Sequence, residues 1–247
     1  MEYWGFGSYG EGVGIERTAD KNDDECVEQL LKTVGLDGVE LIEQNGAYYL
    51  KKTAKAQEYE GKKLELRLDL GGVGKGYAVE KATEYLKSLG YDKGYISLGG
   101  SSIYIMQDPT TSDGSIKVKL VNPRSTVTQS NYYGEIYIKD DAVASSGDYE
   151  RFFEENGVRY CHIIDPKSGY PVSSGAIMAT VSGNSTIADA VATVLVTMDG
   201  EDREKFMAGK WFNEKITGYS VVTQNDGYKV ETSFSLSLTN KHFTLAR

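Results

Sequence analysis

The stretch from Ala144 to Val172 holds His162, one of only two histidines in the chain, three residues before Asp165. Histidine is the side chain whose charge changes most readily near neutral pH, so it can accept or donate a proton during a reaction. Its neighbours Ile163 and Ile164 are apolar, and an alternative interpretation makes His162 an ordinary residue of a strand. His162 alone therefore leaves both interpretations open, a residue that transfers a proton and an ordinary residue of a strand.

A second candidate site lies in the run of small and apolar residues from Ser185 to Val196. Asp189 and Thr193 are four residues apart, so on the predicted helix they share one face, about one turn from each other. Burying a carboxylate among alanines and valines costs free energy unless it is paired or binds a cation. Mg²⁺ prefers oxygen ligands, so the pair predicts a magnesium site. The alternative is an aspartate that hydrogen-bonds the start of its own helix.

A glycine-rich loop, GGVGKG from Gly71 to Gly76, could bind phosphate. Backbone amides at the start of a helix approach anions closely when no side chains stand in the way. The spacing matches neither the dinucleotide-binding GxGxxG pattern nor the GxxxxGK[ST] phosphate loop. A tight turn that needs glycine for its backbone conformation is the alternative interpretation.

The elements around this loop must position it. Leucines alternate with charged residues from Leu64 to Leu70, which predicts a strand with one apolar face. The helical spacing of apolar residues over Ala78 to Leu89, ended by Gly90, predicts a helix. With a further strand expected over Gly94 to Leu98, the three elements predict a βαβ crossover.

The rest of the chain alternates short strands with a few helices. The expected helices cover 23–34, 185–196 (with Ser185 as N-cap) and 199–207, and the expected strands cover 39–42, 47–51, 101–106, 116–121, 132–138, 160–164, 177–182 and a terminal hairpin turning at 225–227. This order predicts an α+β fold with mixed and antiparallel sheets and packed helices, in one unit of two lobes.

Composition excludes several classes of protein. The 247 residues are 40% hydrophobic and 26% charged, which is enough for a core and argues against disorder. A net charge of −9 disfavours nucleic acid and anionic membrane as partners. Cys26 and Cys161 form no disulfide or zinc pattern. We see no transmembrane run and no signal peptide.

Six motifs occur in a characteristic order: WGFG from Trp4, DLGGVGKGYAVEKA from Asp69, SLGGS from Ser97, SSGDYERFF from Ser145, HIIDPKSGYPV from His162 and ADAVAT from Ala188. Together they resemble the FAD:protein FMN transferase family, also called the ApbE family. The resemblance implies one ApbE-like flavin transferase domain over residues 1–247. It also implies magnesium-dependent transfer of FMN from FAD to a threonine hydroxyl of an acceptor protein, with release of AMP.

The resemblance assigns a role to each candidate residue. It implies that Asp189, Thr193 and the carbonyl of Gly72 bind Mg²⁺. Contacts to FAD are implied for Asp69, Lys75 and Ile164, and His162 is implied to take the proton from the acceptor threonine. The acceptor would carry a motif similar to Asp-Gly-x-Thr-Gly-Ala/Ser-Thr.

The chain departs from the family at its start, because members have a segment upstream of WGFG that contributes contacts to FAD. Its absence leaves Trp4 and Phe6 without their usual cover. It also keeps two alternatives open, an FAD pyrophosphatase that forms FMN and AMP, and a flavin-nucleotide-binding protein without activity. A complementing N-terminal segment or a homo-oligomer would supply the missing part. Family members suggest an extracytoplasmic, membrane-associated full-length protein.

Overall fold

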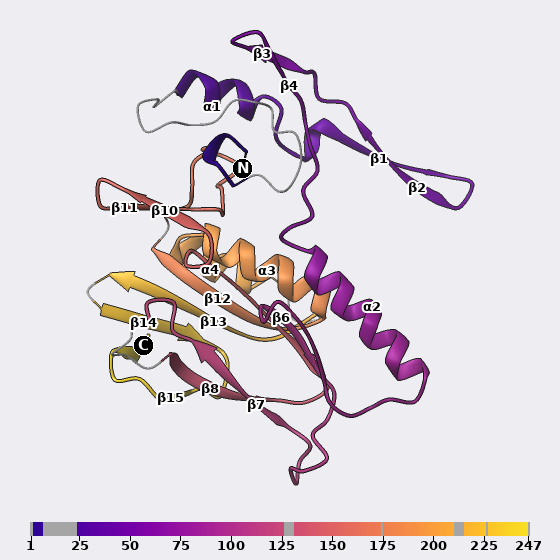
Figure 1. The fold of residues 1–247 in the computed structure, drawn as a ribbon, viewed down its shortest axis with the longest axis vertical. Coiled ribbons are helices and arrows are strands. Elements are labelled where there is room, and N and C mark those ends of the chain that lie inside the picture. The colour runs from indigo at the N-terminus through magenta and orange to yellow at the C-terminus, as the bar shows by residue number, and fades with distance from the viewer. Residues whose placement is uncertain are drawn as a thin grey trace. The chain divides into compact units, whose positions relative to one another are not determined.

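The structure is a computed structural model that describes residues 2–6, 24–125, 131–173, 175–209, 215–225 and 227–246. The chain divides into two compact units (Figure 1). Unit 1 comprises Met1–Asp69 and Arg151–Val172, and unit 2 comprises Leu70–Glu150 and Ser173–Arg247. The predicted site residues are therefore distributed over both units.

Unit 2 is built on a seven-stranded sheet with the order β16-β14-β13-β12-β9-β6-β5. Neighbouring strands pair antiparallel except β14 and β16, which are parallel. The strands are β5 (Tyr95–Leu98), β6 (Ser102–Ile105), β9 (Asp141–Gly147), β12 (Ala176–Gly183), β13 (Ile216–Asn225), β14 (Gly227–Thr232) and β16 (Phe243–Leu245).

Helices α2 (Gly74–Ser88) and α3 (Ser185–Thr197) pack against each other, and α3 packs on β9 and β12 (Figure 1). Helix α3 forms because Ala188, Val191 and Leu195 recur at helical spacing and are buried. Its N-cap is Asn184, whose side chain accepts a hydrogen bond from the Ile187 amide, so the prediction of Ser185 as N-cap is wrong by one residue. Helix α4 (Gly200–Met207) follows, with Asp199 as its N-cap.

A smaller three-stranded sheet, β15-β8-β7, completes unit 2. Its strands are β7 (Ile116–Val121), β8 (Tyr132–Ile138) and β15 (Ser237–Leu238). Tyr133 and Ile136 of β8 share one buried cluster with Met178 of β12 and Val222 of β13. Every residue of β12 is buried. Strand β12 therefore gives a rigid support to helix α3, which packs on it.

The described part of unit 1 combines short helices with three hairpins. These elements are η1 (Glu2–Trp4), α1 (Asp24–Leu31), η2 (Leu36–Gly38), the hairpin β1 (Val39–Gln44) with β2 (Ala47–Lys52), the hairpin β3 (Gln57–Tyr59) with β4 (Lys62–Leu64), and the hairpin β10 (Phe152–Glu155) with β11 (Val158–Cys161). Trp4 and Phe6 belong to its core, with exposed fractions of 4% and 6%, and the Trp4 indole donates to the Gly169 carbonyl over 2.8 Å. The expectation that these two aromatics lack cover is wrong.

The predicted strand over Leu64 to Leu70 is the main error in the fold. The strand β4 ends at Leu64 and pairs only with β3, and residues 65–70 have no regular structure. Leu64 and Leu66 are buried, whereas Leu68 and Leu70 are exposed. A strand needs a neighbour for its amides and carbonyls, and none pairs with this segment within the described ranges. The predicted βαβ crossover is also wrong, because its first strand does not form. Its second strand, β5, pairs antiparallel with β6.

The α+β class with mixed and antiparallel sheets is confirmed. Helix α2 begins at Gly74, inside the glycine-rich loop, rather than at Ala78. It ends at Ser88 with Leu89 as C-cap, one residue before the predicted end, and Gly90 follows in the left-handed region at φ 87°. Among the described residues, no helix combines the length and the apolar character needed to cross a membrane.

Candidate functional site

Asp189 lies where α2 and α3 touch. Its side chain is 2% exposed, and its Oδ2 accepts a hydrogen bond of 2.8 Å from the Gly76 amide in the first turn of α2. A Cβ added to Gly76 would lie 2.4 Å from the Ser185 carbonyl oxygen and 2.6 Å from Asp189 Cβ. Only glycine at this position allows the two helices to approach so closely.

Thr193 lies one turn further along α3, and its hydroxyl is 2.9 Å from Ser146 Oγ on β9. The loop before α2 reaches the same place, because a Cβ added to Gly72 would lie 3.7 Å from Thr193 Oγ1. Gly72, Asp189 and Thr193, which are far apart in the sequence, are therefore brought together on unit 2 by the contact of α2 with α3.

These three residues fit a hard divalent cation. They offer a carboxylate, a hydroxyl and a backbone carbonyl, which are the oxygen ligands that Mg²⁺ binds together with water and substrate phosphates. Within the described residues, no group of three His, Cys, Asp or Glu side chains could hold a metal, so a site for a softer metal has no support there. Asp189 Oδ1 has no hydrogen-bond partner among the described residues and is free to bind a cation.

The fit at Gly76 gives a first prediction. Gly76→Ala will push α2 away from α3, because the new methyl group meets backbone atoms that cannot rotate aside. We expect a loss of about 1–3 kcal/mol in the free energy of unfolding and a weaker affinity for Mg²⁺. Chemical denaturation and titration calorimetry measure the two effects. Gly74→Ala is the control, because its nearest neighbour would be Leu70 Cβ at 4.0 Å, and unchanged behaviour of Gly76→Ala would contradict the packing argument.

His162 follows β11 on unit 1, and its Nδ1 lies 3.2 Å from the carbonyl oxygen of Arg151. A carbonyl oxygen only accepts hydrogen bonds, so Nδ1 carries the hydrogen of the neutral ring. The lone pair is then on Nε2. The Arg151 carbonyl also accepts from the His162 amide, and the Phe6 ring lies edge-on to the imidazole at 6.4 Å between centroids. These contacts hold the ring in one orientation, which a general base requires.

The other predicted residues have simpler surroundings. Lys75 is half-buried at the second position of α2, on unit 2. Asp69 is exposed on unit 1. Ile164, also on unit 1, pairs with Pro171 in an isolated bridge and packs against the aromatic core. Asp69, His162 and Ile164 therefore belong to one unit, and Gly72, Lys75, Asp189 and Thr193 to the other.

Two contacts near the site were not predicted from the sequence. Ser146 hydrogen-bonds Thr193, and Arg124 forms a two-pronged ion pair with Asp148 over 2.6 and 2.5 Å. The second contact anchors Asp148 in the turn that follows β9, while Ser146 lies on β9 itself. The SSGDY motif marked this stretch, but nothing in a single sequence shows which helix a serine on a strand will face.

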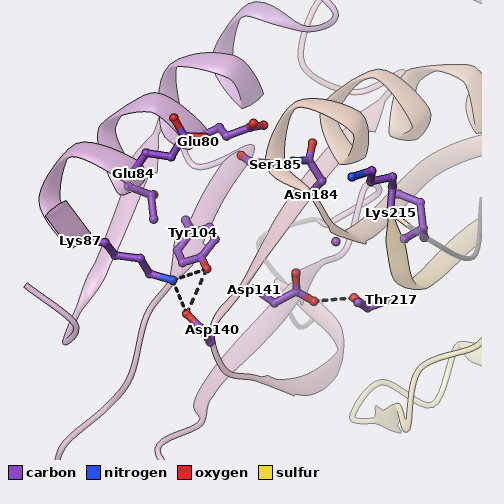
Figure 2. A pocket seen from close by; sticks show the side chains of 13 residues that line it. Glu80, Glu84, Lys87, Tyr104, Asp140, Asp141, Asn184, Ser185, Lys215 and Thr217 are labelled. Atoms are coloured by element: carbon purple, nitrogen blue, oxygen red, sulfur yellow. Dashed lines mark hydrogen bonds and ion pairs between the residues drawn. The ribbon is translucent and has the colours of Figure 1, made fainter.

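A polar pocket of about 380 Å³ opens on unit 2 at a different place (Figure 2). Its lining comprises Glu80, Thr83, Glu84, Lys87, Tyr104, Asp140, Asp141, Gly183, Asn184, Ser185, Lys215, Ile216 and Thr217. Lys87 pairs with Asp140 and Tyr104, and burial raises the pKa of the Asp141 carboxyl, which accepts a hydrogen bond from Thr217. None of the predicted site residues lines this pocket.

Comparison with known proteins agrees with the motifs. The ApbE family matches residues 1–215. A "FAD:protein FMN transferase" of Vibrio cholerae is 34% identical over 172 residues, which are 69% of this chain and 49% of that protein. The Escherichia coli protein of the same name is 23% identical over 230 residues, 93% of this chain and 59% of that protein. The chain thus spans about half the length of the curated relatives it matches.

Solved structures of ApbE proteins are also similar to this chain. The ApbE protein of Thermotoga maritima is 28% identical with a TM-score of 0.67, and the match covers 96% of this chain and 66% of that chain. The flavin transferase ApbE of Vibrio cholerae is 25% identical with a TM-score of 0.64, and the match covers 92% of this chain and 64% of that chain.

Proposed function

The chain belongs to the ApbE family, and from this we propose that it transfers FMN from FAD to a threonine hydroxyl of an acceptor protein and releases AMP. The observation that carries the proposal is the convergence of Gly72, Asp189 and Thr193 at the start of α2. Relatives named for this reaction support the assignment.

The residues of unit 2 would bind the charged part of the substrate. Asp189, Thr193 and the Gly72 carbonyl would hold Mg²⁺, which when bound offsets the negative charge of a pyrophosphate. Lys75, at the second position of α2, and the positive end of the helix dipole would add positive potential. This local charge is needed because the chain as a whole carries −9.

The residues of unit 1 would act on the acceptor and the flavin. His162, with its hydrogen on Nδ1, would accept the threonine proton at Nε2 as the hydroxyl oxygen bonds to the phosphorus attached to FMN. The phosphorus attacked is that of the FMN half of FAD; its bond to the bridging oxygen breaks, and AMP leaves with that oxygen. We further propose that Asp69 and Ile164 contact FAD, that the acceptor carries a short threonine motif, and that the full-length protein works outside the cytoplasm.

A reaction with separate products tests the proposal. The chain would be incubated with FAD, Mg²⁺ and an acceptor peptide containing the threonine motif, while AMP release and acceptor mass are followed together. We expect AMP and an acceptor heavier by one FMN less one water. AMP with an unmodified acceptor would instead establish an FAD pyrophosphatase, and FAD binding without either product would establish a flavin-nucleotide-binding protein.

A further inference from the structure

Strand β9 presents two neighbouring serines to opposite faces of the large sheet. Ser145 Oγ lies 2.9 Å from Thr180 Oγ1, and Ser146 Oγ lies 2.9 Å from Thr193 Oγ1. Successive side chains of a strand point to opposite faces, and Ser146 meets α3. Two hydroxyl pairs with the same separation thus start from adjacent residues, and only one involves a predicted cation ligand.

The direction of the Ser146–Thr193 hydrogen bond decides whether Thr193 can bind a cation. A hydroxyl has one hydrogen and two lone pairs, and a cation takes a lone pair. The hydrogen must then point elsewhere. The Asp189 carbonyl within α3 is 3.5 Å from Thr193 Oγ1, at the limit of a hydrogen bond, whereas Ser146 Oγ is 0.6 Å closer, at 2.9 Å.

We propose that Ser146 is a positioning residue, which accepts the hydroxyl hydrogen of Thr193 and so turns a lone pair of that oxygen toward the cation. The inference rests on the proposed function, because it deepens the same cation site. Groups that orient a metal ligand change metal affinity about 10–100-fold when they are removed. Ser146 would orient the Thr193 hydroxyl in this way. It lies on β9, whose position is fixed by pairing with β6 and β12.

The test compares three variants by titration calorimetry with Mg²⁺, in the presence of saturating FAD, and by thermal unfolding. We expect Ser146→Ala to weaken Mg²⁺ binding about 10-fold or more. Ser146→Thr keeps a hydroxyl at the position and should restore most of the affinity. Ser145→Ala loses a hydrogen bond of equal length to Thr180 and should leave the affinity of the wild type.

The outcomes separate this inference from the proposed function. If the wild type binds Mg²⁺ and Ser146→Ala binds it equally well, the positioning role is wrong while the cation site stands. The role is also wrong if Ser145→Ala weakens binding as much as Ser146→Ala, because both changes would then act through stability. If the wild type binds no Mg²⁺, the cation site fails and the inference fails with it.

Discussion

Asp189→Asn is expected to remove Mg²⁺ binding while the chain stays folded. Asparagine has the shape of aspartate and keeps an oxygen that can accept from the Gly76 amide, but it lacks the charge that binds a divalent cation. Because even a residue that only orients a ligand changes affinity up to about 100-fold, loss of the one carboxylate should cost at least that much. FMN transfer should fall with it.

Thermal unfolding gives a readout that does not depend on activity. A cation that binds only the folded chain raises the melting temperature, so Mg²⁺ should stabilise the wild type and not Asp189→Asn. Asp141→Asn is the matched control, since it removes another partly buried carboxylate of unit 2 from the polar pocket. Equal stabilisation of wild type and Asp189→Asn by Mg²⁺ would show that the cation binds elsewhere.

Asp189→Ala separates the structural part of this role from the chemical part. It leaves the buried Gly76 amide without its acceptor, which costs about 1–3 kcal/mol of stability. We therefore expect Asp189→Ala to be less stable than Asp189→Asn, although both lose Mg²⁺. The carboxylate serves α2–α3 packing even without a cation, and this explains how a charged side chain is tolerated among apolar residues.

The sequence predicted α3 and the placement of Asp189 and Thr193 on one face of it, because helical spacing alone fixes which residues share a face. Predicting that Asp189 and Thr193 lie on the same face required no knowledge of the rest of the fold. Their partners Gly76 and Ser146 could not be found in this way. Those contacts depend on how closely two helices approach and on which face of β9 meets α3, and both are set by tertiary packing.

The strand predicted over Leu64 to Leu70 failed for a related reason. Alternating leucines specify a face for burial only if a neighbouring strand exists, and the segment beyond β4 has no such partner within the described residues. The same segment leads into Gly71 and the start of α2, where the amides of Val73 and Gly74 donate to the Leu70 carbonyl and the Gly76 amide donates to Asp189. The alternation of leucines therefore did not predict the structure here, because the pairing of strands decided it.

His162→Ala is expected to slow FMN transfer about 10²–10⁴-fold, the usual contribution of a general base. Binding of FAD should change little, because the proposed role of the imidazole is toward the acceptor hydroxyl. Single-turnover transfer at saturating FAD and acceptor measures the rate, and fluorescence titration measures FAD affinity. His242→Ala is the control, since His242 is the other histidine and is exposed on unit 2.

The pH dependence distinguishes a base from a merely structural histidine. Imidazole must be neutral to accept a proton, so the wild-type rate should rise with pH as the ring loses its proton. His162→Ala should lose this rise, whereas a histidine that only supports the fold would leave the profile unchanged in shape. The Nδ1 hydrogen bond to the Arg151 carbonyl predicts that Nε2 is the accepting atom. His162→Gln, which cannot act as a base, should therefore be as slow as His162→Ala, and wild-type rates in either variant would remove the histidine from the reaction.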